Sequence, residues 1–314
     1  MSGKSSDEMA RFAQQANKAA KSLSASTLDY TEAALIYYQQ GLSDEQIKKR
    51  TDATVKMANV TGENAENVSS YMTAIWNNFA KGSENLEYYA DVITALGAAT
   101  ASSSEEIAGG LEKFAAIGET VGLSYEYATS ALATVVAATR QSEDTVGTSF
   151  KTLFARIQGL QQGEEQDDGV TLNKYSQALA NVGINVLNTN GELKEMDKIL
   201  DELGSKWNTL GKSQQTALAQ TIGGTRQYTQ LISLMENWGT FQENVSIARN
   251  SEGSLNKQAE IYEESWQAAS KRVQTALESI YNKLINDEGF ISLLNVAEDF
   301  IGVIDRIIDG LGGL

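Results

Sequence analysis

Not one of the 314 residues is proline. Proline ends helices because its ring removes an amide donor and clashes with the preceding turn, and an average composition would place on the order of fifteen prolines in a chain of this length. Helices can therefore run wherever the apolar residues support them, with turns made by Gly, Asn and Ser. We interpret the missing proline as a property of a helix-rich protein, in preference to a special role such as passage through a narrow channel.

Apolar residues recur at helical spacing from Asp7 onward, with turn signals about every 15 to 20 residues. This pattern predicts an all-α fold, a multi-helix bundle of stacked helical hairpins with long C-terminal helices. The expected helices cover residues 5–23, 27–40, 44–60, 64–80, 85–99, 104–117, 125–141, 143–162, 171–182, 196–210, 212–223, 225–237, 254–286 and 289–310.

Three sixteen-residue stretches look related, beginning at Met57, Leu96 and Ile117. Their alignment brings together three predicted N-cap residues, whose side-chain oxygens can accept a bond from a first-turn amide. These are Asn64, Ser103 and Ser124. The helix after each cap carries one apolar stripe. The stretches are either true repeats or independent helical hairpins with similar turns.

Residues 184–194 differ from their surroundings. The pair Asn190-Gly191 between apolar residues suits a tight type I′ turn, so we expect one small β-hairpin or extended loop here. A calcium-binding EF-hand is rejected because Val186 occupies its first ligand position. The sequence GEEQDDG at 163–169 is interpreted as a solvated acidic loop, since its spacing matches no calcium loop.

The segment 254–286 predicts a single long helix of about 50 Å. Such a helix must lie along another element or pair with a copy of itself. Its apolar residues step by four and three, and we assign the larger ones to a helix-packing or oligomer face. That face consists of Leu255, Tyr262, Trp266, Val273, Leu277, Ile280 and Leu284.

The segment 289–310 predicts an amphipathic helix with an unusually wide apolar face. Burial against other helices is the first interpretation, because helices that lie on membranes usually carry Lys or Arg on the polar side. Membrane binding is the alternative, so we assign a membrane or partner face. It consists of Phe290, Leu294, Ile301, Ile304, Ile308 and Leu311.

The composition excludes several classes of site. The chain has no His and no Cys, which removes Ser-His-Asp triads, thiolate nucleophiles and the usual zinc sites. A formal charge of -16 opposes binding to nucleic-acid phosphates. We therefore expect no cofactor, no metal, no catalytic residue and no sequence-specific nucleic acid partner. Residues 1–10 lack the apolar run of a signal peptide.

Several long segments together are similar to one known family. In chain order they are MTAIWNNF (72–79), ITALGAATASSSEEIAGGLEKFAAIGETVGLSYEYATSALATV (93–135), GTSFKTLFARIQGL (147–160), YSQALANVGINV (175–186), MDKILDELGSKW (196–207), QTALAQTIGGTRQYTQLISLMENW (215–238) and ESWQAASKRVQTALESIY (264–281). They resemble the core region of the TP901-type phage tail tape measure proteins. The resemblance covers residues 50–310 and is specific because the segments agree in order.

The resemblance implies a structural, non-enzymatic protein. Such a protein sets tail length, fills the lumen of the tail tube and is released toward the host envelope when DNA is ejected. Its implied partners are the tail tube protein, tail assembly chaperones, distal tail or baseplate proteins and further copies of itself. The resemblance implies that the protein is located in the virion tail lumen, in the host cytoplasm during assembly and at the host envelope at ejection. We expect the chain to be the core of a longer protein.

Three domains are expected: N-terminal helices in 1–49, the tape-measure core in 50–253 and the C-terminal helices in 254–314. Two other functions remain open. The first is a membrane-active helical protein that inserts its C-terminal amphipathic segment. The less favoured one is a cell-wall hydrolase using carboxylate pairs such as Glu105 with Glu106 or Asp167 with Asp168, although neighbours on a helix point apart.

Overall fold

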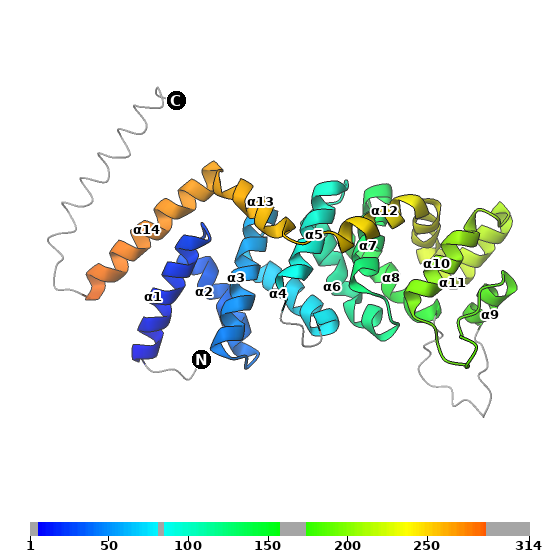
Figure 1. Ribbon diagram of the computed structural model, residues 1–314, viewed down its shortest axis with the longest axis horizontal. Helices are drawn as coiled ribbons and strands as arrows, with labels where there is room; N and C mark the ends of the chain where they lie inside the picture. Colours follow the sequence, from blue (N-terminus) through cyan, green and yellow to red (C-terminus); the bar gives the residue numbers. More distant parts are fainter. Residues whose placement is uncertain (1–5, 81–84, 158–173, 287–314) are drawn as a thin grey trace, which may run out of the picture. The chain divides into compact units, whose positions relative to one another are not determined.

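The structure, a computed structural model, describes residues 6–80, 85–157 and 174–286, with side-chain burial given between residues 11 and 280 of these ranges. The described chain is helical, which confirms the predicted all-α fold (Figure 1). The helices are α1 (Ser6–Ser22), α2 (Thr27–Gln39), α3 (Asp44–Thr61), α4 (Ala65–Ile75), the π-helix η1 (Trp76–Ala80), α5 (Glu87–Ala99), α6 (Ser104–Thr120), α7 (Tyr125–Thr139), α8 (Glu143–Ile157), α9 (Lys174–Asn181), α10 (Met196–Trp207), α11 (Lys212–Glu236), α12 (Trp238–Arg249), α13 (Ser254–Glu263) and α14 (Trp266–Asn286).

The chain divides into two compact units. Unit 1 takes both ends of the chain, Met1–Thr31 and Glu263–Leu314, and unit 2 takes Glu32–Tyr262. The described part of unit 1 therefore contains α1, the start of α2 and α14. The predicted division into 1–49, 50–253 and 254–314 stays a prediction.

In unit 2, α6 packs against α4, α5, α7 and α8, and Figure 1 shows α6, α7 and α8 side by side. Glycines allow α6 and α8 to approach closely, because a Cβ on Gly147 would lie 2.4 Å from the carbonyl oxygen of Gly110. Beside this crossing, the ring centroid of the fully buried Phe150 lies 5.6 Å from that of Phe114 and 5.2 Å from that of Phe154. Such ring pairs stabilise a core beyond their buried area.

The three predicted N-caps are confirmed. Asn64, Ser103 and Ser124 each accept a hydrogen bond from the backbone amide three residues later, and Ser103 forms a full capping box with Glu106. The stripes that follow the caps are buried throughout. They consist of Val68, Met72, Ile75, Ile107, Leu111, Phe114, Ala128, Leu132 and Val135.

Residues 184–194 form the predicted extended loop, closed by an isolated antiparallel bridge between Leu187 and Leu193. The turn type was predicted wrongly. A type I′ turn needs positive φ at both central residues, whereas Gly191 has φ 81° and Asn190 is not among the residues with positive φ. Instead, the side-chain oxygen of Asn188 accepts bonds from the amides of Asn190 and Glu192 at 2.9 and 3.0 Å. This side chain organises the turn.

Helix α11 is broken at Gly224, where the expected helices 212–223 and 225–237 meet. Gly224 has φ 65° and ψ -166°, a conformation that is essentially restricted to glycine. The break leaves carbonyl groups without helical partners, and Arg156 Nη1 donates to the carbonyl oxygen of Ile222 at 2.9 Å. The guanidinium of Arg156 also lies 5.6 Å from the ring centroid of Tyr175, so one side chain joins α8, α9 and α11.

Two features of the C-terminal third differ from the expected helices. Helix α12 lies where no helix was predicted, and the expected single helix over 254–286 is two helices, α13 and α14. The second difference has a local cause, because Ser265 Oγ accepts a bond from the amide of Ala268 at 3.1 Å and so caps a new helix. The expected helix over 289–310 and the loop 163–169 lie outside the described residues.

Candidate interaction surfaces

The residues of the predicted helix-packing face differ in burial, and the face itself stays a prediction. Leu255 is fully buried in unit 2, whereas Trp266, Val273 and Leu277 of unit 1 are 75%, 45% and 43% exposed. Tyr262 and Ile280 are half-buried, and the side chain of Leu284 lies outside those described. The apolar spacing therefore identified residues on one side of a helix but not which of them would be covered.

The first turn of α13 is held by Asp91 of α5, a buried carboxylate that is only 5% exposed. Its two oxygens accept bonds from the amides of Gly253 at 3.0 Å and Leu255 at 2.8 Å. Burial raises the pKa of Asp91, and these two amides partly offset the effect because they stabilise the charged form. Sequence reasoning missed Asp91, since its partners lie about 160 residues away.

Lys56 adds a second connection at the same place. Its Nζ lies 2.7 Å from a carboxylate oxygen of Glu87 and donates to Asn256 Oδ1 at 3.0 Å. With Leu255 buried and Asp91 bound to two amides, the segment 251–254 is anchored to α3 and α5. This segment, SEGS, is therefore a bonded turn in the structure.

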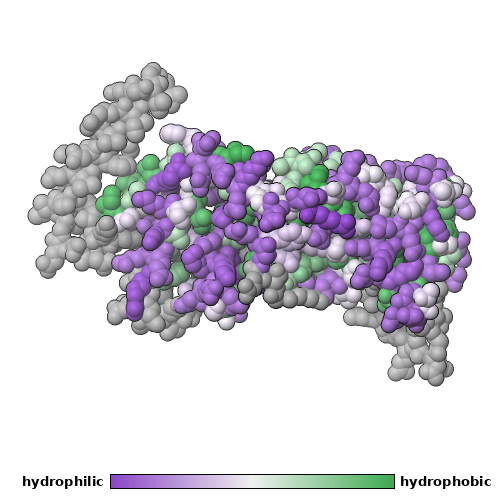
Figure 2. All heavy atoms as spheres, viewed as in Figure 1, coloured by the Kyte–Doolittle hydropathy of each residue, from purple (hydrophilic) through white to green (hydrophobic). Residues whose placement is uncertain are grey.

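In unit 1, α14 packs against α1 and is bonded to the start of α2. Thr275 Oγ1 donates to the carbonyl oxygen of Ala25 at 2.5 Å, and Lys271 Nζ lies 2.7 Å from a carboxylate oxygen of Asp29. Ala268 and Thr275 are fully buried and mark the covered side of α14. In Figure 2, hydrophobic residues in green are also visible along α14.

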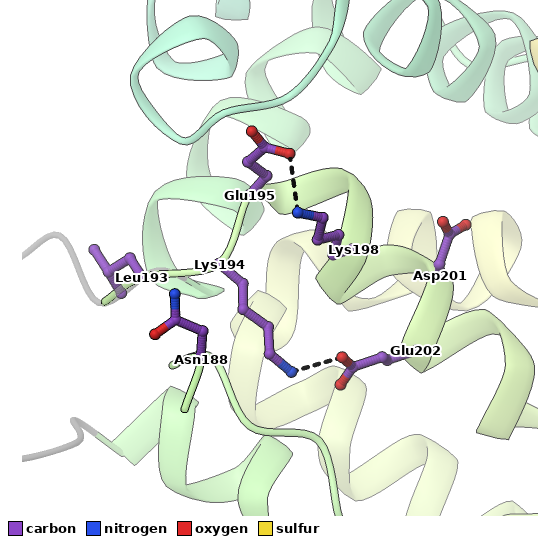
Figure 3. Close-up of a pocket in the computed structure, with 7 residues that line it drawn as sticks. All are labelled: Asn188, Leu193, Lys194, Glu195, Lys198, Asp201 and Glu202. Carbon is purple, nitrogen blue, oxygen red and sulfur yellow. Dashed lines mark hydrogen bonds and ion pairs between the residues drawn. The ribbon is translucent and has the colours of Figure 1, made fainter. Parts of the chain in front are cut away.

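A polar recess of about 520 Å³ lies between the loop 184–194 and α10 (Figure 3). Four of its charged side chains form two pairs: Lys194 Nζ lies 2.6 Å from a carboxylate oxygen of Glu202, and Lys198 Nζ lies 3.6 Å from one of Glu195. The recess is completed by Asn188, Leu193 and Asp201. The lining holds two lysines and three carboxylates, and Asp201 has no lysine partner among these residues, so the recess keeps a net negative charge and disfavours an anion.

The same end of α10 is tied to α7. Tyr127 donates its hydroxyl to Asp201 at 3.0 Å, and Asp197 accepts from the amide of Ser124 at 3.0 Å. Burial raises the pKa of Tyr127, and the Asp201 carboxylate raises it further. Burial also raises the pKa of Asp197, and the hydrogen bond from Ser124 partly offsets this rise. These bonds stabilise helix contacts.

Of the carboxylates considered for hydrolysis, the structure describes Glu105 and Glu106, which lie in the first turn of α6. Glu106 is occupied in the capping box with Ser103. Burial and the neighbouring Glu63 raise the pKa of Glu105. Asp167 and Asp168 lie outside the described residues. Among the described residues, no cluster of three or more acidic side chains has metal-site geometry.

The tryptophans differ in burial. Trp76 and Trp207 lie in the core and are 2% and 1% exposed, and Trp238 is half-buried. Trp266 is 75% exposed, because no described helix covers the side of α14 on which it lies.

The membrane or partner face predicted over Phe290 to Leu311 lies outside the described residues. Within the described ranges, every helix is too short or too polar to cross a membrane.

Comparison with protein families matches residues 3–224 to the phage-related minor tail proteins. The chain belongs to this family. As a phage-related minor tail protein it is a structural protein of the virion tail and acts among other tail components. The match runs from α1 to Gly224, the residue at which α11 is broken. No solved structure matches the chain.

Proposed function

We propose that the chain is the folded core of a tail tape measure protein. The observation that carries this proposal is the family match over residues 3–224, which is joined by the ordered segments of the tape measure resemblance over 50–310. The helical fold is consistent with it, as is the charge of -16, which would limit adhesion to the DNA that passes through the same tube.

A tape measure role requires the chain to lie inside the tail tube. In intact purified tails, we expect the chain to be present by mass spectrometry and to resist an added protease until ejection is triggered. Exposed tail-tip proteins serve as the control, since the same protease should cleave them throughout. Cleavage of this chain in intact tails would contradict the proposal.

Length determination gives a second test, which predicts how much the tail lengthens per inserted residue. If the chain is extended as helix in the tail, each inserted residue adds about 1.5 Å. An in-frame insertion of helical sequence in the gene should lengthen the tail in that proportion, as measured by electron microscopy. An insertion of equal length in the tail tube gene should leave tail length unchanged.

The finer assignments belong to the same proposal. We infer partners among the tail tube protein, assembly chaperones, distal tail or baseplate proteins and further copies of the chain. We also infer that the chain is released toward the host envelope. Its domains are proposed to be residues 1–49, 50–253 and 254–314. The membrane hypothesis is tested by liposome flotation of the full chain, with Ile301→Asp and Ile304→Asp together as the variant. Equal flotation of both proteins would contradict it.

A further inference from the structure

The outer side of α14 carries large apolar side chains, while its covered side carries small ones. Trp266, Val273 and Leu277 are 75%, 45% and 43% exposed, whereas the fully buried Ala268 and Thr275 are small. A helix at the surface of a globular protein normally turns its large apolar residues inward. We therefore expect a further element of the protein or a partner to cover the outer side of α14.

The apolar spacing of α14 is repeated in the chain that follows it. In α14 the apolar residues step by three or four, at Trp266, Ala269, Val273, Leu277, Ile280 and Leu284. The expected amphipathic helix over 289–310 continues into the same alternation, at Phe290, Leu294, Ala297, Ile301, Ile304, Ile308 and Leu311. Two helices whose apolar residues follow this spacing can pack along a common seam.

The length of the two segments and the connection between them fit an antiparallel pair. Helix α14 has 21 residues and is about 31 Å long, and a helix over 289–310 would be about 33 Å long, by helix rise. Only Asp287, Glu288 and Gly289 separate Asn286 from Phe290. Connections of about two to five residues are typical of hairpins of two antiparallel helices, and glycine is favoured where a helix ends.

The charges of the two segments are complementary. The sequence of α14 has one carboxylate, Glu278, against three cations, Lys271, Arg272 and Lys283. The segment 290–311 has one cation, Arg306, against four carboxylates, Glu298, Asp299, Asp305 and Asp309. Opposite charge favours this pair, whereas two copies of α14 would repel each other and an acidic segment is repelled by an anionic lipid surface.

We propose that the outer face of α14, defined by Trp266, Val273 and Leu277, binds the apolar seam of residues 289–310 of the same chain to form an antiparallel helical hairpin. The inference goes beyond the tape measure proposal and does not depend on it. A short connection holds the segment at an effective concentration in the millimolar range. A separate partner would have to compete with that tether.

The first test uses pairs of cysteines in a chain that has none of its own. With equal rise on both sides of the connection, Ile304 comes to about the level of Val273. The variant with Val273→Cys and Ile304→Cys should therefore form a disulfide within one chain under mild oxidation. The matched control combines Val273→Cys with Arg306→Cys, which has nearly the same tether but places the second thiol on the polar side of the expected helix.

The disulfide of the Ile304 pair should form about tenfold faster than that of the Arg306 pair, because a disulfide requires close and aligned Cβ atoms. Mass spectrometry under non-reducing conditions measures the loss of free thiols and whether the product has the mass of one chain or two. Equal rates for the two pairs would overturn the proposal. Disulfides that join two chains would also overturn it, since a second copy would then cover the face.

The second test measures whether Trp266 is covered, by hydroxyl-radical footprinting of the full chain without lipid. Ile301→Asp and Ile304→Asp together should raise the modification rate of Trp266 about fivefold over the wild-type chain, because two charges in the seam oppose its burial. Trp207, which is 1% exposed, should keep its rate if the rest of the fold is intact.

The matched control for this test adds the same two charges to the polar side of the expected helix. Ser292→Asp and Asn295→Asp together should leave the modification rate of Trp266 unchanged. Equal rates for Trp266 in the wild-type chain and the Ile301→Asp, Ile304→Asp variant would contradict the inference, because the segment would then not cover the face.

Discussion

Removing the Asp91 carboxylate should release the start of α13 from α5. In Asp91→Ala, the half-buried amide of Gly253 and the buried amide of Leu255 lose their acceptors, which lie at 3.0 and 2.8 Å. Each hydrogen bond to a charged group contributes about 1.5–3 kcal/mol to stability. Part of the loss of two such bonds is offset, because the variant no longer buries a charged carboxylate. The net loss should therefore be about 2–4 kcal/mol in the free energy that closes this turn.

Amide hydrogen exchange measures that loss at the affected groups. A loss of 2 kcal/mol corresponds to about 30-fold faster exchange at Gly253 and Leu255, since each 1.4 kcal/mol is tenfold. The matched control is Asp144→Ala, whose side chain is 65% exposed and pairs with Lys113 at 3.0 Å. A surface pair of this kind contributes about 0–1 kcal/mol. Unchanged exchange at both amides in Asp91→Ala would refute the reasoning.

The same carboxylate predicts a pH dependence with a definite sign. Burial raises the pKa of Asp91 above its ordinary value of 3.8, so the folded state binds this proton more tightly than the unfolded state. The stability contributed by protonation is present below 3.8 and is lost as the pH rises through the higher folded-state pKa. Relative to Asp91→Asn, the wild-type chain should therefore lose stability from pH 3.5 toward pH 7. A difference that grows in the opposite direction would contradict this.

Two further substitutions test features of the backbone by urea denaturation. Gly224→Ala should lower the free energy of unfolding by about 1–3 kcal/mol, because φ 65° with ψ -166° is strained for any other residue. In the control Gly239→Ala, the added Cβ meets open space, so this substitution should be neutral or stabilising. Equal effects of the two substitutions would contradict the strain argument. Ser103→Ala should cost about 1 kcal/mol by removing the cap of α6, whereas Ser104→Ala should cost less, and the reverse order would show that the capping box contributes little.

Features of this fold that depend on neighbouring residues could be predicted from the sequence. The caps at Asn64, Ser103 and Ser124 each need only an oxygen and an amide three residues away. The break at Gly224 follows from two adjacent glycines. Helix α12 was missed because it follows α11 directly and Asn237 makes no side-chain cap bond, so no turn signal precedes it.

Features that depend on distant residues could not be predicted. Periodicity placed Trp266, Val273 and Leu277 on one side of a helix, but it cannot tell which side another helix will cover. The bonds of Asp91 to Gly253 and Leu255 join segments that are far apart in the sequence, and a lone Asp in a helix carries no sign of such a role. The candidate interaction face is therefore a result of the tertiary structure.

The joint between α8 and α9 has a consequence for where this chain can change in length. Arg156 lies over Tyr175, and Ser176 Oγ donates to the carbonyl oxygen of Ile157 at 3.5 Å, so contacts outside residues 158–173 hold both ends of that connection. An inserted sequence or a fused tag in this part of the chain would therefore keep α8 and α9 packed only if it left the contacts of Arg156 and Ser176 intact.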